Sequence, residues 1–165
     1  MTEKVMRHMP EGSLVLLNGD LNNNLFKYAH QCDRTRPDLQ FLSLQLMSWD
    51  WFVPMQAHHY PNITFPGSRY HPYAQGGFSI RTFLDRNQKR FKDRIFLCGP
   101  WKDGDESYKG VYHTLPFAMC DKLIKVPKSQ RGTLQGSNGQ TDLGTAADLR
   151  PGVQALPTLE EVIND

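Results

Sequence analysis

Short apolar runs separated by stretches of helical spacing make up most of the chain up to residue 126. Residues 14–17 (LVLL) are uninterruptedly apolar, which is typical of a strand that is covered on both faces. Residues 39–44 and 94–98 predict two further strands, and residues 117–126 alternate loosely enough to predict one at an edge of the sheet. The pattern therefore predicts four strands with helices between them.

Apolar residues three or four positions apart predict those helices. The stripe of the first helix consists of Leu21, Leu25, Tyr28, Ala29 and Cys32. Asp20 and Asn22 stand at its start, where either side chain can cap free N–H groups. A second helix is expected over residues 47–59. It should break and restart at Pro54, because an interior proline costs about 3 kcal/mol. A third helix is expected over residues 80–91.

This order of elements predicts an α/β fold, a small Rossmann-like domain of three layers with a mostly parallel sheet, over residues 1–126. All 9 Phe, 3 Trp and 6 Tyr residues precede Pro127. Residues 127–165 are instead rich in Gly, Ser, Gln, Thr and Pro. Such a segment cannot bury enough apolar surface to offset a chain entropy of about 1 to 2 kcal/mol per residue, so we expect a disordered tail there.

Charge and hydropathy exclude several classes of partner. The 19 basic and 17 acidic side chains give a net charge of +2, too small to predict binding to nucleic acid or to an anionic membrane. No apolar run approaches the roughly 20 residues that cross a bilayer, so no membrane span is expected in this chain. No apolar signal region follows the first basic residues, and no secretory signal is expected.

The cysteines and histidines predict neither a metal site nor a cofactor. Cys32, Cys98 and Cys120 have no CxxC spacing, and free cysteines in helices and strands are usually small buried apolar residues. One disulfide with one free thiol is the alternative in an oxidising compartment. No HExxH motif occurs among the six histidines, and His58 and His59 are expected on opposing sides of a helix.

Candidate binding residues follow from the strand ends, because ligands of open α/β sheets bind beyond the carboxyl ends of the strands. Residues 18–24, 43–51 and 98–101 are therefore of interest. The candidate crevice residues within them are Asn18, Asp20, Asn22, Trp49 and Trp51. The turn at 18–24 has a single glycine and lacks the Lys-Ser/Thr ending of a P-loop, which disfavours nucleotide binding.

Three hypotheses concern these residues. Gly19-Asp20-Leu21-Asn22 resembles the GDxN turn of the endonuclease/exonuclease/phosphatase family, which implies a metal-dependent hydrolase that uses Asp20 and Asn22. That family also needs a Ser-Asp-His ending and paired sheets, and the sequence indicates neither. Asp20 as a helix cap is the second hypothesis, since helix N-termini favour Asp by about 1 kcal/mol. An interaction module with Trp49 and Trp51 at its contact surface is the third.

A long loop over residues 62–77 is rich in Pro and Gly, which suggests a surface segment with a role of its own. It contains the N-glycosylation sequon Asn62-Ile63-Thr64. Such triplets also arise by chance, so Asn62 indicates a lumenal or secreted setting only together with other features.

Several separated motifs occur in one order along the chain. They are residues 12–20 (GSLVLLNGD), 36–38 (RPD), 48–54 (SWDWFVP), 65–70 (FPGSRY) and 110–116 (GVYHTLP). Together they resemble the transmembrane protein 260 family of O-mannosyltransferases over most of residues 10–125. The resemblance ends near Val126, where the family would continue into paired helices of repeat type.

The resemblance implies a lumenal part of an enzyme of the endoplasmic reticulum membrane. Members carry many membrane helices ahead of this domain and transfer mannose from dolichyl phosphate mannose to Ser or Thr of receptor IPT domains. Their catalytic acidic residue lies in an early lumenal loop that these motifs do not include. No catalytic residue is therefore assigned to this chain, and the fragment alone is expected to be non-catalytic.

Overall fold

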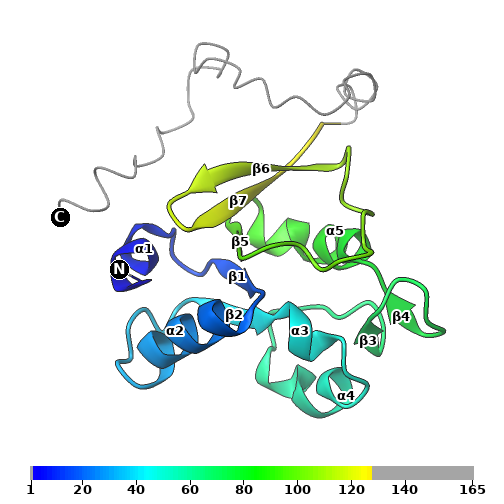
Figure 1. Cartoon of the computed structure of the whole chain (residues 1–165), viewed down its shortest axis with the longest axis horizontal. Helices are drawn as coiled ribbons and strands as arrows, with labels where there is room; N and C mark the ends of the chain where they lie inside the picture. The colour runs from blue at the N-terminus through cyan, green and yellow to red at the C-terminus, as the bar shows by residue number, and fades with distance from the viewer. Residues whose placement is uncertain (1, 128–165) are drawn as a thin grey trace.

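The computed structural model describes residues 2–127, which form a sheet with helices on both faces (Figure 1). The five strands lie in the order β2-β1-β5-β7-β6. They are β1 (Leu14–Leu17), β2 (Gln40–Ser43), β5 (Ile95–Cys98), β6 (Tyr112–Phe117) and β7 (Cys120–Lys125). Strands β2, β1 and β5 are parallel, and β7 is antiparallel to both β5 and β6, so only β7 runs the opposite way. The α/β class with a mostly parallel sheet is confirmed.

The helices separate into two layers. One face carries α1 (Thr2–His8) and α2 (Asp20–Gln31), and the other carries α3 (Leu44–Met47), α4 (Phe52–Gln56), η1 (Ala57–His59) and α5 (Ile80–Phe91). Side chains of β1 alternate between the two cores, with Leu14 and Leu16 facing one and Val15 and Leu17 facing the other. Burying each such side chain contributes about 1.5 to 3 kcal/mol, which explains why LVLL forms an interior strand.

Helix α2 forms as expected but is rotated relative to the predicted stripe. Leu21, Leu25, Tyr28 and Cys32 are exposed, whereas Phe26 and Ala29 are buried. The Phe26 ring lies 5.9 Å from that of Phe41 on β2. The helix has apolar residues on two faces, and the face that holds the fully buried Phe26 ring is the one that packs on the sheet.

Three other predictions need correction. Helix α1 and strand β6 were not expected, and the strand predicted at the sheet edge, β7, lies between β5 and β6. The helix predicted over 47–59 is divided into α4 and η1, with Pro54 in the first turn of α4 as expected. In η1 the rings of His58 and His59 have centres 3.8 Å apart, so the two side chains are neighbours rather than on opposing sides.

The short β3 (Arg69–Tyr70) and β4 (Gly77–Phe78) form a parallel pair within and after the predicted loop. Within residues 2–127, no helix combines the length and apolar character that a bilayer crossing needs. The predicted disordered tail, residues 127–165, lies outside the described residues except for Pro127.

Cys98 and Cys120 form a disulfide, and Cys32 is a free, exposed cysteine. The alternative of one disulfide and one thiol is thus confirmed, and the prediction that Cys32 and Cys98 are buried free cysteines is wrong. The bridge joins the end of β5 to the start of β7, which are neighbouring strands. A spacing of 22 residues with no CxxC motif gave no means of choosing this pair beforehand.

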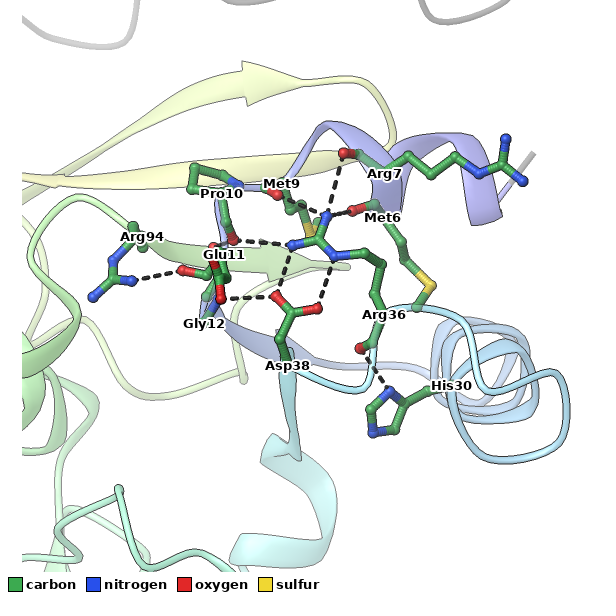
Figure 2. A network of polar contacts seen from close by, with 11 residues as sticks. Met6, Arg7, Met9, Pro10, Glu11, Gly12, His30, Arg36, Asp38 and Arg94 are labelled. Atoms are coloured by element: carbon green, nitrogen blue, oxygen red, sulfur yellow. Dashed lines mark hydrogen bonds and ion pairs between the residues drawn. The ribbon is translucent and has the colours of Figure 1, made fainter.

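The Arg36-Pro37-Asp38 motif connects the segment before β2 to the segment between α1 and β1, at the amino ends of these strands (Figure 2). The Arg36 guanidinium donates to the carbonyl oxygens of Met6, Arg7, Met9 and Pro10 at and after the end of α1. It also donates to both carboxylate oxygens of Asp38, each at 2.8 Å, and Asp38 accepts a bond from the Gly12 N–H at 2.9 Å. The motif is therefore structural, at the sheet end opposite the predicted crevice.

Candidate functional site

The carboxyl ends of β1 and β5 are joined closely at the floor of the predicted crevice. The Asn18 backbone N–H donates to the Cys98 carbonyl oxygen at 3.1 Å, and Asn18 Nδ2 donates to the Pro100 carbonyl oxygen at 2.9 Å. Gly99 has φ of 111°, and a Cβ atom there would lie 2.2 Å from the Asn18 carbonyl oxygen. Only glycine permits this approach of two backbones.

A crevice of about 440 Å³ opens above this floor. Its lining residues are Asn18, Gly19, Asp20, Gln45, Ser48, Pro100, Trp101, Lys102 and Asp103. A neighbouring hollow of about 540 Å³ shares Ser48 and Lys102 with it. The other residues of this hollow are Trp49, Asp50, Trp51, Arg69 and His71. Together the two hollows bring all three tryptophans of the chain to one region.

The tryptophans differ in how they are held. Trp101 stacks on Tyr108 with ring centres 4.1 Å apart, which fixes its orientation. Trp49 and Trp51 are 57% and 44% exposed, an unusual degree for such large apolar side chains. Exposed aromatic rings beside fixed polar groups are typical of surfaces that bind a partner.

Lys102 is the charged group common to both hollows. Its Nζ lies 5.2 Å from the centre of the Tyr70 ring, a cation–π distance. Burial lowers the pKa of Lys102, and the negative charge of Asp105 partly opposes this change. Burial and the same carboxylate raise the pKa of Tyr70. At the far side of the second hollow Arg69 pairs with Asp50.

The predicted site residues divide into two groups. Asn18 and Asp20 line the crevice, and Trp49 and Trp51 line the neighbouring hollow. Asn22 points inward instead, and its Nδ2 donates to the Asn18 carbonyl oxygen at 3.1 Å. Asn22 therefore serves the turn and does not line the crevice.

The capping prediction is wrong, because Gly19 is the N-cap of α2 and makes no side-chain cap bond. Asp20 is the first helical residue, where a negative charge interacts favourably with the partial positive charge of the helix N-terminus. No group of three or more His, Cys, Asp or Glu residues in the described part of the chain could hold a metal ion. With Asn22 engaged in the turn, no observation favours the hydrolase hypothesis.

Sequence reasoning did not single out Trp101, Lys102, Arg69 or His71. Trp101 falls in the range 98–101 given by the strand-end rule, which does not distinguish it from its neighbours, and Lys102 lies one residue beyond that range. Arg69 lies in the two-residue strand β3 and His71 follows it, within the segment between η1 and α5 that carries no periodic signal in the sequence. Their place in the hollow depends on how that loop folds back, which sequence spacing does not show.

The sequon lies in a turn that folds firmly against α5. Asn62 Oδ1 accepts a bond from Arg90. The Thr64 N–H donates to Asn87 Oδ1 at 2.8 Å, and Asn87 Nδ2 donates back to the Thr64 carbonyl oxygen at 2.9 Å. Ile63 between them is buried. The sequon backbone is thus fixed once the domain has folded.

Two curated relatives show the family of the chain. The protein O-mannosyl-transferase tmem260 of Dictyostelium discoideum is 37% identical over 128 residues, which are 77% of this chain and 15% of that protein. The protein O-mannosyl-transferase TMEM260 of Mus musculus is 33% identical over 122 residues, 70% of this chain and 17% of that protein. No family model and no solved structure matches the sequence.

The α/β domain therefore belongs to a family of protein O-mannosyltransferases. That family is TMEM260, so the resemblance seen in the ordered motifs is confirmed. The chain spans 15 to 17% of the length of these relatives.

Proposed function

We propose that this chain is an accessory, non-catalytic domain of a protein O-mannosyltransferase. The whole enzyme would transfer mannose from dolichyl phosphate mannose to Ser or Thr of receptor IPT domains. The observation that carries the proposal is the similarity over 70 to 77% of the chain to proteins named as O-mannosyltransferases, of which it represents 15 to 17%. A share this small supports a supporting role for the domain within a longer polypeptide.

A lumenal position at the endoplasmic reticulum membrane is part of the proposal. The Cys98–Cys120 disulfide supports it, because disulfides persist in oxidising compartments and are rare in the cytosol. The Asn62 sequon lies in a surface turn, as N-glycosylation in that compartment requires. The two features are independent of each other and favour the same compartment.

The role proposed for the domain is to position the acceptor protein. Trp49 and Trp51 provide an exposed aromatic surface, and Arg69 and Lys102 provide donors beside it. Aromatic side chains and arginine contribute most to protein interfaces, so this hollow is the part of the domain best suited to an acceptor domain. The interaction-module hypothesis is retained in this form.

Binding and transfer measured with the full 165-residue chain test the proposal. We expect the chain to bind an isolated IPT domain and to transfer no mannose to it from dolichyl phosphate mannose. Replacing both Trp49 and Trp51 by Ala should weaken binding about tenfold or more, since each truncation removes an exposed ring of the interface. Tyr28→Ala is the control, because Tyr28 is equally exposed but lies on α2.

Two results would contradict the proposal. Mannose transfer by the isolated chain would show that the domain is catalytic. Binding that is absent, or that survives loss of both tryptophans but not the Tyr28 substitution, would show that the hollow does not position the acceptor.

A further inference from the structure

A third pocket, of about 610 Å³, lies between α2, β2 and the α4–η1 segment. Trp51 is the one residue that lines both this pocket and the hollow described above. The volume is within the range of about 300 to 1,000 Å³ that is typical of small-molecule sites. Nothing in the proposed acceptor-binding role uses this pocket.

Aromatic rings from two parts of the chain line the pocket. The Phe52 ring lies 5.8 Å from Trp51 and 6.2 Å from Tyr60, and all three line the cavity. Phe41 contributes a fourth ring from β2. Phe41 and Phe52 are buried, whereas Trp51 is 44% exposed and Tyr60 is partly exposed. Trp51 and Tyr60 therefore offer the apolar ring surfaces against which the C–H groups of a ring-shaped ligand can pack.

Three amide side chains also line the pocket, one each from α2, β2 and α4. The side chains of Gln31, Gln40 and Gln56 line the pocket, and none has a hydrogen bond to another group within residues 2–127. Gln40 Oε1 is a buried acceptor without a donor. Primary amides present both donors and acceptors, so they match ligands whose groups do both.

Lys27 adds a cation that no carboxylate neutralises. Its ammonium is half-buried, forms no ion pair in the described part of the chain, and has a pKa lowered by burial. None of the residues that line the pocket is Asp or Glu. The pocket therefore favours an oxygen-rich ligand that accepts hydrogen bonds and excludes cationic ligands.

We propose that this pocket binds one pyranose ring of a glycan. A pyranose has a C–H face that packs on aromatic rings and hydroxyl groups that both donate and accept. The accessible rings of Trp51 and Tyr60, the unpaired amides and the unneutralised ammonium meet these requirements together. A purely apolar ligand would leave the amides and Lys27 without partners, which disfavours its binding.

The sugar has two sources, which share this chemistry. Asn62 lines the same pocket, so the first ring of an N-glycan attached there would lie at its rim. A glycan of another protein is the second source. The two are distinguished by comparing chain made without glycans with glycosylated chain and its Asn62→Gln variant.

Titration of the unglycosylated, oxidised 165-residue chain with methyl α-mannopyranoside, methyl α-glucopyranoside and N-acetylglucosamine tests the proposal. Nuclear magnetic resonance should show saturable shifts of the Trp51 indole and of the Gln31 and Gln56 amides. Gln56→Leu should raise the dissociation constant for the sugar about tenfold. Gln45→Leu, which removes an amide from the crevice instead, should leave it unchanged. Sorbitol, an open-chain polyol, controls for nonspecific hydroxyl contacts.

Native-like spectra of both variants would exclude misfolding as the cause of any loss. The proposal is overturned if no sugar gives saturable shifts up to roughly 50 mM, if sorbitol gives the same shifts, or if Gln45→Leu weakens binding as much as Gln56→Leu. Free sugar that binds glycosylated chain only after Asn62→Gln would identify the chain's own glycan as the occupant. Equal binding to both forms would identify a glycan of another protein.

Discussion

Replacing Asp38 by Asn tests how much the Arg36 network stabilises the domain. Arg36 lowers the pKa of Asp38 from 3.8 to about 2, chiefly through its side-chain hydrogen bonds, and the Gly12 N–H assists. Since each pKa unit corresponds to about 1.4 kcal/mol, the charge of Asp38 contributes about 2 kcal/mol at neutral pH. The side chains of Arg36 and Asp38 are only 20% and 25% exposed, so solvent screening is limited.

The sign of the pH dependence follows from the lowered pKa. A carboxylate whose pKa is lower in the folded state stabilises the protein above its unfolded pKa, and this contribution disappears as the pH falls through the folded value. The deficit of Asp38→Asn should therefore be about 2 kcal/mol at pH 7 and shrink to roughly half by pH 3. Arg36→Met should lower the free energy of unfolding by about 3 kcal/mol at pH 7, because the carbonyl oxygens at and after the end of α1 also lose their donor.

Urea unfolding of the full chain between pH 7 and pH 3, followed by tryptophan fluorescence, measures these differences. Glu3→Gln is the matched control, because Glu3 and Arg7 form a 3.7 Å pair with side chains 48% and 69% exposed. That substitution should change stability by less than about 0.5 kcal/mol. A deficit for Asp38→Asn that equals the control at pH 7, or that stays constant down to pH 3, would refute the reasoning.

Three further predictions concern other parts of the domain. Replacing Cys98 and Cys120 by Ser should lower the unfolding free energy by about 3 kcal/mol, because the bridge closes a loop with a separation of 22 residues; addition of reductant to the variant should then change nothing. Asn87→Ala should cost about 2 to 3 kcal/mol in urea unfolding, since the Thr64 N–H and carbonyl lose their partners, whereas an unchanged midpoint would mean that solvent replaces them. Calorimetric titration with Mn²⁺ should give the same result for the unsubstituted chain and for Asp20→Ala. Stoichiometric Mn²⁺ binding by the unsubstituted chain that Asp20→Ala abolishes would restore the hydrolase hypothesis.

The sheet interior could be predicted because its strands are apolar on both faces. Residues 14–17 and 94–98 have no other stable location, and the helix between residues 80 and 91 has its apolar residues on a single face. Helix α2 has two apolar faces, so its rotation was decided by packing of Phe26 that spacing alone does not reveal. Strand β6 has exposed residues and Pro116, which are tolerated at a sheet edge but weaken the strand signal.

The candidate site was predictable as far as a general rule applies. Strand ends located Asn18 and Asp20, and the neighbouring segment located Trp49 and Trp51. The third pocket was not predicted, since Lys27, Gln40 and Gln56 come from three elements whose facing sides depend on the rotation of α2. The hydrogen bonds of Arg36 were also not predicted, because they reach carbonyl oxygens about thirty residues earlier in the chain.

Strand β7 is the last element of the described chain, yet it occupies an inner position of the sheet. During synthesis the edge of β5 that pairs with β7 has no hydrogen-bonding neighbour until residues 120–125 have left the ribosome. An unpaired strand edge readily recruits foreign strands, so nascent chains of this domain should depend on chaperones during that interval. A protein that ends before residue 120 would lack β7, would keep that edge of β5 unpaired permanently and should aggregate.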